Sequence, residues 1–422
     1  MRLFIKLAIC KHLAKLIHCL KHCGFSRFAT RYQSLVTRYS ASSDSTIKFS
    51  VKISPAQSDF LNCSRWVAAW LVVAEHARSL IFVDYGELQS PGLLAKGFYF
   101  LTGFGHEAVM VFFVISGYLV GGKVWSLFRK GGFEWRRYLA DRLSRLYAVL
   151  LVALVLGTVL DWTGYLFFNK YGFYNQGYEG AIAVLGTAPI ERMGGWDFLV
   201  NAFFLQTIVG PPFGSNGPLW SLAYEWWYYI LFPGILLIVF RKSVAGVMVG
   251  VGLTLLLIFV LPSDIVWLFG IWILGVAASM WTKRVPPWGL AMCLLVSILL
   301  IARGEVLKVP YASQYLLGAS YALSIVSLAR CEWRMPWFRA AAYLADFSYS
   351  VYLIHFPVLM CLLAVGFEFF GFGIRMPFGF AVLVWYGGVF GSAIIVAWIV
   401  SLFTERKTAI LRRILYSCLH VR

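Results

Sequence analysis

The fold of this chain is decided by residues 62–82, which read NCSRWVAAWLVVAEHARSLIF. The hydrocarbon core of a bilayer is about 30 Å thick, and a helix needs about 20 largely apolar residues to cross it. This run has that length, yet it contains Arg65, Glu75, His76 and Arg78. Because a charge near the bilayer centre costs at least about 3 kcal/mol, such residues are candidates for function.

The rest of the 422-residue chain is also typical of a membrane protein. It is 60% hydrophobic and only 13% charged, whereas soluble domains have about 45–50% apolar and 25% charged residues. We therefore predict an all-α polytopic membrane protein with about ten transmembrane helices. Their approximate ranges are 62–82, 107–127, 143–163, 219–240, 244–261, 265–282, 288–302, 314–330, 344–367 and 379–403. The apolar piece Phe198–Val209 is shorter, so we expect it to be re-entrant or interfacial.

The net charge of +18 gives the orientation of these helices. Lys and Arg near span ends concentrate on the cytoplasmic side of a membrane. Of the 37 basic residues, 28 fall in the two termini or in alternate loops. Both termini are therefore predicted to be cytoplasmic, and the positive charge needs no nucleic-acid partner. None of the eight cysteines falls in a predicted outside loop, so no disulfides are expected.

Three parts follow from this pattern: a basic amphipathic extension (1–58), a transmembrane domain (59–405) and a short basic cytoplasmic tail (406–422). The extension would suit an anionic membrane surface, but an organellar presequence looks similar, and a segment without a specific role is as good an interpretation. It contains the run His18-Cys19 to His22-Cys23, whose spacing would allow metal ligands on a helix. Chance clustering explains that run more simply, and no metal is expected.

The long outside loop, residues 164–218, is rich in aromatic residues, glycine and asparagine. Aromatic rings with amide neighbours can stack on sugar rings at an extracytoplasmic surface. An aromatic belt at the lipid interface would have the same composition. Both interpretations stay open from the sequence.

The ionisable residues within the spans fall into two zones of depth. Arg65 and His76 are eleven residues apart, so on a helix they share one face and lie about 16 Å apart. A predicted inner zone is cationic and suits phosphate, which arginine binds in a bidentate manner; it comprises Arg65, Lys123, Arg142 and Arg145. A predicted deeper zone suits proton transfer; it comprises Glu75, His76, Glu225 and His355.

Simpler roles are available for several of these residues. Arg142 and Arg145 are placed where topology anchors usually occur. Glu75 could form a local ion pair with Arg78, and Glu225 could hold helices together through a hydrogen bond.

Five separated strings carry a family resemblance, namely Phe60 to Arg65 with His76, Val111 to Tyr118, Arg142-Leu143-Ser144-Arg145, Leu219-Trp220-Ser221-Leu222 with Glu225, and Ser348-Tyr349 with His355. In this order, from about Phe60 to Glu405, the chain resembles the acyltransferase 3 family of integral-membrane O-acyltransferases. These enzymes modify surface polysaccharides, lipopolysaccharide and related glycans. One departure is Asn62, where the family usually has an acidic residue.

The resemblance implies an enzyme of the bacterial inner membrane that takes an acyl group, commonly acetyl, from cytoplasmic acyl-coenzyme A. The acceptor would be a carbohydrate hydroxyl of a surface polysaccharide or glycolipid on the far side. It makes His76 the main catalytic candidate, as general base or transient acyl carrier. Glu225 and His355 become secondary catalytic candidates. Arg65, Arg142 and Arg145 become candidates for binding the donor's phosphates.

Two other functions fit the residues themselves. A proton-coupled transporter or flippase of a glycolipid or other anionic solute would also place Glu, His and Arg within its spans, although we find no internal inverted repeat. A scaffold for polysaccharide assembly would keep the fold without the chemistry. Consumption of acyl-coenzyme A distinguishes an enzyme from both.

Overall fold

A computed structural model describes residues 53–170, 172–175, 187–240, 243–283, 285–286, 311–373 and 375–421. Within these ranges every regular element is a helix. The metal-spaced run at residues 18–23, nearly all of the predicted extension and the predicted span 288–302 lie outside the described residues.

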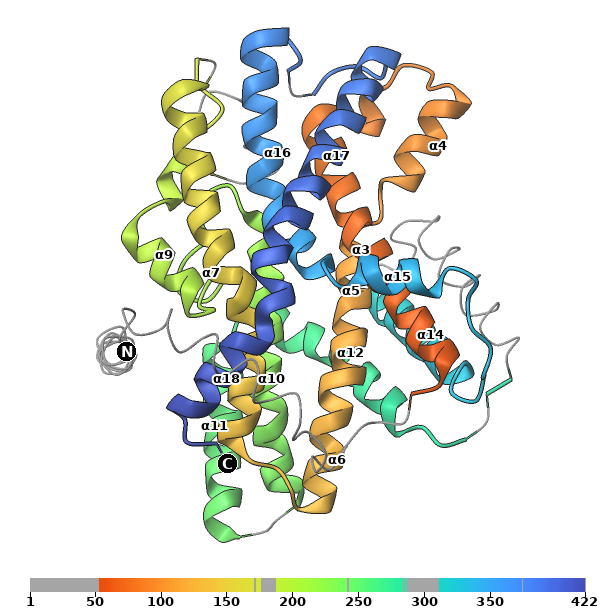
Figure 1. Cartoon of the computed structure of the whole chain (residues 1–422), viewed down its shortest axis with the longest axis vertical. Helices are drawn as coiled ribbons and strands as arrows, with labels where there is room; N and C mark the ends of the chain where they lie inside the picture. The colour runs from red at the N-terminus through yellow and green to blue at the C-terminus, as the bar shows by residue number, and fades with distance from the viewer. Residues whose placement is uncertain are drawn as a thin grey trace, which may run out of the picture.

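Figure 1 shows the helices as an elongated bundle, with α6, α11 and α18 at one end and the far ends of α16 and α17 at the other. The elements, in chain order, are α3 (Pro55–Ile81), η2 (Tyr85–Glu87), α4 (Leu93–Leu101), α5 (Gly105–Ser116), the π-helical turn η3 (Gly117–Gly121), α6 (Gly122–Lys130), α7 (Trp135–Phe167), η4 (Pro189–Arg192), α9 (Gly195–Ala202), η5 (Gly217–Leu219), α10 (Trp220–Phe240), α11 (Val244–Val260), α12 (Ser263–Met280), α14 (Ala312–Ser327), α15 (Phe338–Ala345), α16 (Ser348–Phe370), α17 (Phe380–Phe403), η6 (Glu405–Lys407) and α18 (Thr408–Cys418).

Every predicted span on the described residues is helical over most of its length. The span 344–367 begins at the end of α15, crosses the break at residues 346–347 and continues in α16. Six segments there are long and apolar enough to cross a membrane: Leu93–Lys130, Trp135–Phe167, Gly217–Phe240, Ser263–Met280, Ser348–Phe370 and Phe380–Cys418. The protein is therefore a multi-pass membrane protein. Helix α3 is long but carries several charged residues, and α11 is apolar but has only 17 residues. The total of about ten spans and the cytoplasmic placement of both termini stay predictions.

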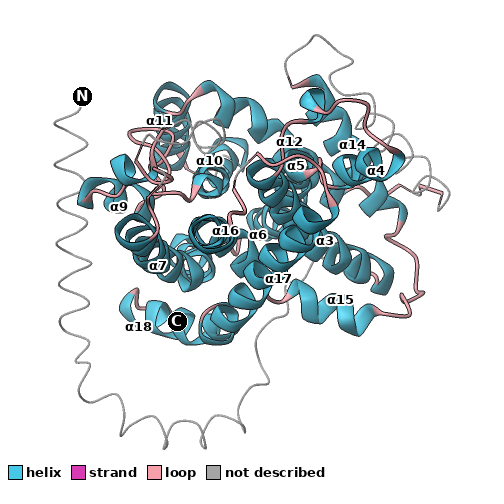
Figure 2. Cartoon of the chain, turned by 90° about the horizontal axis from the view of Figure 1, so that it is seen from above, coloured by secondary structure: helices cyan, strands magenta, loops and turns pink. Residues whose placement is uncertain are grey.

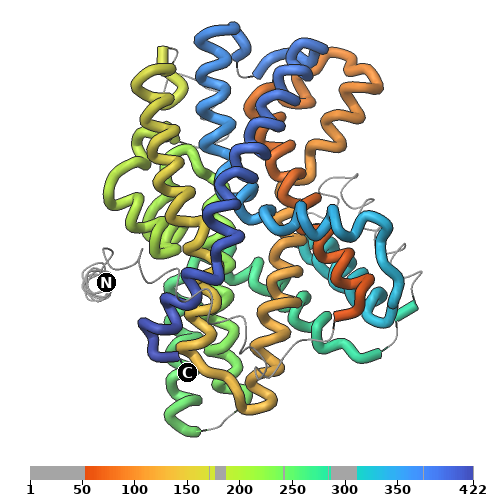
Figure 3. The backbone as a smooth tube through the Cα atoms, in the orientation of Figure 1, coloured from red at the N-terminus to blue at the C-terminus, as the bar shows by residue number. Residues whose placement is uncertain are grey.

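The end of the bundle where α6 ends, α7 begins and α18 lies is called the basic end below. Arg129, Lys130, Arg136 and Arg137 lie there. Figure 3 shows the C-terminal segment, in dark blue, returning along the bundle to lie beside α7 at this end. Under the predicted topology, the basic end faces the cytoplasm.

Helix α16 is the central element, and Figure 2 shows the other helices arranged around it. Its sequence is apolar on all sides, as expected of a helix that other helices surround. Its neighbours include α3, α7 and α17. The central helix therefore lies where residues from several other helices can meet it.

Two prolines inside helices each leave a backbone carbonyl that a side chain from another segment contacts. A proline has no N–H, so it leaves the carbonyl four residues earlier without its helical donor. Pro357 frees the carbonyl of Leu353 in α16, and Asn216 donates its side-chain N–H to that oxygen at 2.8 Å. Pro233 likewise frees the carbonyl of Tyr229 in α10, and the hydroxyl of Tyr138 donates to it at 2.9 Å.

The glycine in the string Val111 to Tyr118 has a packing explanation. At Gly117 an added Cβ would collide with the backbone oxygen of Trp272, and at Gly275 it would collide with the backbone of Val114. The indole N–H of Trp272 also donates to Ser116 at 3.1 Å. Glycine is required at both positions because the η3 turn and α12 touch backbone to backbone.

Candidate active site

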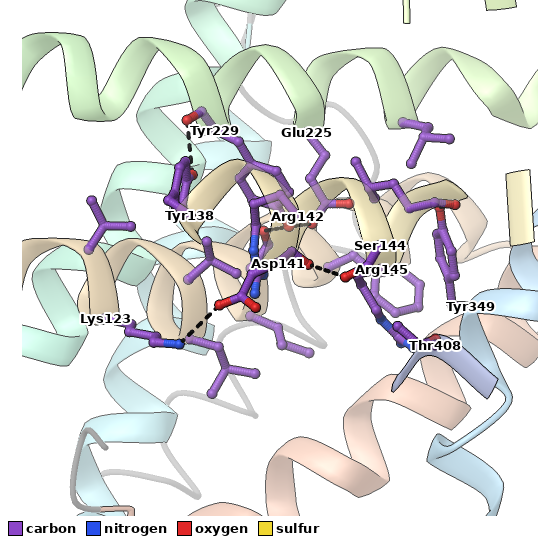
Figure 4. Close-up of a pocket in the computed structure, with 18 of the residues that line it drawn as sticks. Lys123, Tyr138, Asp141, Arg142, Ser144, Arg145, Glu225, Tyr229, Tyr349 and Thr408 are labelled. Atoms are coloured by element: carbon purple, nitrogen blue, oxygen red, sulfur yellow. Dashed lines mark hydrogen bonds and ion pairs between the residues drawn. The ribbon is translucent and has the colours of Figure 1, made fainter. Parts of the chain in front are cut away.

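A cavity of about 900 Å³ opens within the half of the bundle nearer the basic end. It lies among α5, α6, α7, α10, the start of α16 and η6, and Figure 4 shows part of its lining. Its cationic lining residues are Arg65, Lys123, Arg137, Arg142, Arg145 and Arg412, and its acidic ones are Glu134, Asp141, Glu225, Asp346 and Glu405. All three arginines predicted to bind the donor therefore line one cavity.

The two arginines of the Arg-Leu-Ser-Arg motif differ in their partners. Arg145 donates to Glu405 at 2.6 Å, and that buried carboxylate also accepts the backbone N–H and hydroxyl of Ser350, each at 3.0 Å. Glu405 thus caps the first turn of α16 while it holds α7. Arg142 has no ion pair among the described residues, and its guanidinium lies 5.7 Å from the centre of the Tyr229 ring. Arg142 is therefore available to a ligand, whereas Arg145 is engaged in the structure.

The other two cationic residues predicted for this zone, Arg65 and Lys123, also differ in whether they form an ion pair. Arg65 on α3 is half-buried and makes no ion pair within the described ranges. Lys123 lies 3.7 Å from Asp141, which also accepts the hydroxyl of Tyr416 in α18 at 2.7 Å. Asp141 thereby connects α6, α7 and the C-terminal helix at one side of the cavity.

Glu225 lines the large cavity, and it accepts a hydrogen bond from the hydroxyl of Tyr229 one turn later on α10. Tyr229 also lies 3.1 Å from the hydroxyl of Ser116. The structure thus places Glu225 with the arginines and not beside His76, with which the sequence grouped it.

A second cavity, of about 230 Å³, lies on the far side of this one from the basic end. Its lining includes His76, Glu75, Ser79, His106 and Trp220. Glu75 accepts the backbone N–H of His106 at 3.1 Å and lies 3.9 Å from a guanidinium nitrogen of Arg78. The local ion pair considered for Glu75 is therefore present, but the carboxylate also joins α3 to the first turn of α5.

The two candidate histidines are in direct contact. His76 Nδ1 lies 2.9 Å from His355 Nε2, and the two rings are nearly coplanar at 3°. His355 is fully buried, and its Nδ1 lies 3.0 Å from the carbonyl oxygen of Val351. Because a carbonyl can only accept, His355 Nδ1 carries the proton, and Nε2 of the neutral ring accepts from His76 Nδ1–H. Neutral His76 then has its lone pair on Nε2, in the half-buried ring that lines the small cavity.

Besides the acids that line the large cavity, two further acidic residues in helices were missed from the sequence. Asp161 in α7 is fully buried and accepts both the backbone N–H and the hydroxyl of Ser215 at 2.8 Å, so it anchors the loop before α10. An acid in the predicted span 143–163 was a signal for it. Asp59 is also buried, and it accepts from Arg334 at 3.2 Å and from the backbone N–H of Met335 at 3.0 Å. It lies one turn before Asn62, where the family usually has its acid.

The fold and these cavities define a membrane-embedded helical protein with a chamber that contains six basic side chains next to a hydrogen-bonded histidine pair. The model of the acyltransferase 3 family, described as an acyltransferase domain, matches residues 58–402, and the chain belongs to this family. An uncharacterized protein of Haemophilus influenzae is 28% identical over 151 residues, which are 36% of this chain and 57% of that protein. No solved structure gave a significant match. Membrane acyltransferase activity is the function that the family indicates.

Proposed function

We propose that this protein moves an acyl group, in the first place acetyl, from cytoplasmic acyl-coenzyme A to a carbohydrate hydroxyl on the extracytoplasmic side. One observation supports this most strongly: a cavity at the basic end, whose lining includes the three arginines predicted to bind the donor, adjoins a small cavity that contains an oriented histidine pair. The two cavities would separate binding of the donor from the chemistry. The membrane would be the inner membrane of a bacterium.

The donor would enter the large cavity with its phosphates against Arg142 and Arg65, two of the three arginines predicted to bind it, neither of which has an ion pair in the described part of the chain. Charge-assisted hydrogen bonds to phosphate are about twice as strong as neutral ones. Arg65 and His76 lie eleven residues apart on α3, a rise of about 16 Å. An extended pantetheine arm can cover that distance, so the thioester would arrive beside His76.

In the transfer, His76 Nε2 takes the proton of the acceptor hydroxyl while the oxygen of that hydroxyl forms a bond to the thioester carbonyl carbon. The carbon–sulfur bond then breaks, and coenzyme A leaves as the thiol after it receives that proton. His355 supports the step because it holds the Nδ1–H of His76 and keeps the Nε2 lone pair directed at the reactants. A transient acyl-histidine would use the same lone pair.

The acceptor would enter the small cavity from the opposite side. Trp220 supplies an aromatic face, and Glu75, Ser79 and His106 supply polar groups around His76. Aromatic faces with a few polar partners suit a sugar ring that presents one hydroxyl. A surface polysaccharide or a glycolipid would supply such a ring.

The test uses everted membrane vesicles from cells that make the protein, since these vesicles supply the acceptor. Given acetyl-coenzyme A labelled in the acetyl group, wild-type vesicles should transfer label to carbohydrate and release free coenzyme A. His76→Ala should lower this transfer by roughly 10²–10⁴-fold. His420→Ala, at an exposed position near the C-terminus, is the matched control and should leave it unchanged.

Two results would overturn the proposal. Undiminished transfer by a well-expressed His76→Ala protein would remove the histidine from the chemistry. Movement of a glycolipid or anion by the wild type without any cleavage of the thioester would instead favour the transporter or flippase.

A further inference from the structure

The two cavities share part of their wall. Val109 of α5 and Tyr352 of α16 line both of them. Tyr352 is only 8% exposed, so other atoms of the protein closely surround its side chain. A group that moves from the large cavity to His76 through this shared wall passes these two side chains.

Hydrogen bonds hold the Tyr352 ring in this wall. Its hydroxyl lies 2.6 Å from the hydroxyl of Ser221 and 3.2 Å from the carbonyl oxygen of Pro218. The Ser221 hydroxyl is itself 3.3 Å from that carbonyl, so two hydroxyl protons serve three contacts. The tether is strong enough to define a position, yet the protons can rearrange without leaving a buried group unpaired.

The wall lies next to the reacting groups. Tyr352 precedes His355 by three residues on α16, and their ring centres are 6.2 Å apart. The Phe112 ring packs edge-to-face with the Tyr352 ring, with centres 5.8 Å apart. Tyr352 therefore has little room to turn away in the direction of either neighbour.

We infer that Tyr352, tethered to Ser221 and lining both cavities together with Val109, is the residue that limits the length of the acyl group. This inference rests on the proposed function, because it requires a thioester that reaches His76 from the large cavity. An acetyl group adds one methyl to the carbonyl, whereas each further methylene needs space that the wall occupies. One methylene too many in a closed apolar site typically lowers the specificity constant by about 10–200-fold.

The inference is tested by competition between two thioesters. Everted vesicles receive acetyl-coenzyme A and butyryl-coenzyme A together, each with a different label, and both labels are counted in the carbohydrate fraction. The wild type should prefer acetyl. In Tyr352→Ala the butyryl-to-acetyl ratio should rise at least tenfold.

Milder variants keep the test informative if Tyr352→Ala does not fold. Tyr352→Phe and Ser221→Ala each remove one hydroxyl of the tether and keep the ring, so they should raise the ratio by a smaller amount. Tyr311→Phe is the matched control, because it removes a tyrosine hydroxyl that donates to Asp264 at 2.6 Å outside both cavities.

The outcomes separate the two ideas. If the wild type transfers acetyl and the ratio stays unchanged in all variants of the wall, the sieve is wrong while the proposed function survives. Equal use of both thioesters by the wild type would also refute the sieve. If the wild type cleaves neither thioester, the proposed function itself fails.

Discussion

The large and the small cavity differ in how their ionisable residues are held. In the large cavity, opposite charges are interspersed. The protein pairs some of them, such as Arg145 with Glu405, while Arg142 has no ion pair among the described residues. In the small cavity, a hydrogen-bond relay that ends on a backbone carbonyl fixes His76. The comparison teaches that the partners of an ionisable residue indicate its role better than its depth in the membrane does. They distinguish residues that bind ligand from residues that carry out the chemistry and from residues that hold helices together.

The largest effect among the following variants is expected from His355, because it orients the reacting base without touching the donor. His355→Ala removes the acceptor of the His76 Nδ1–H, so kcat should fall by roughly 10²-fold. The KM for acetyl-coenzyme A should stay unchanged, since the large cavity is intact. Initial rates in everted vesicles at several donor concentrations measure both constants. A raised KM with normal kcat would place His355 in donor binding and erase the distinction between the cavities.

A smaller effect is expected at the two arginines of the Arg-Leu-Ser-Arg motif, but here the two variants should differ in kind. Arg142→Ala should raise the KM for acetyl-coenzyme A about tenfold, because one charge-assisted contact to phosphate is lost. Arg142→Lys should recover part of this loss, since the charge returns without the bidentate geometry. Donor saturation curves provide the measurement.

Arg145→Ala is the matched comparison for Arg142→Ala. It leaves the buried Glu405 without its cation, so it should destabilise the protein by about 1–3 kcal/mol and lower its thermal midpoint in detergent. If instead Arg145→Ala were fully stable and Arg142→Ala had a normal KM, the structural and ligand-binding roles would have to be exchanged or abandoned.

The smallest effect on the chemistry is expected at the hydrogen bond from Asn216 to the carbonyl oxygen of Leu353. Asn216→Ala leaves the Leu353 carbonyl without a donor and should cost about 1–3 kcal/mol of stability. Pro357→Ala supplies a backbone N–H to the same oxygen, so the double variant should regain most of the lost thermal midpoint. Additive losses in the double variant would show that Asn216 stabilises the protein through another contact.

Much of the fold was predictable because it depends on local apolar length. The predicted stretches are helical over most of their length wherever the structure describes them, and Phe198–Val209 contains most of α9, whose eight residues rise only about 12 Å. The shared face of Arg65 and His76 also followed from helix geometry alone. The π turn at Gly117–Gly121 was not predicted, because its cause is contact with α12 more than 150 residues later.

The pairings within the site could not be derived from local sequence. Arg142 and Arg145 look equivalent in the chain, and only Glu405, 260 residues later, distinguishes them. His76 and His355 were both candidates, but their contact joins positions 279 residues apart. Glu225 had a depth similar to that of His76, yet depth says nothing about which cavity a side chain enters.

The most direct test of the central claim is the sidedness of transfer in sealed everted vesicles. Acetyl-coenzyme A added outside cannot cross the bilayer, so labelled acetyl should appear on carbohydrate inside the lumen while free coenzyme A appears outside. His76→Ala vesicles should show neither product above background. Label confined to the outer face, or thioester cleavage that is independent of His76, would contradict the account of two cavities that meet at this histidine.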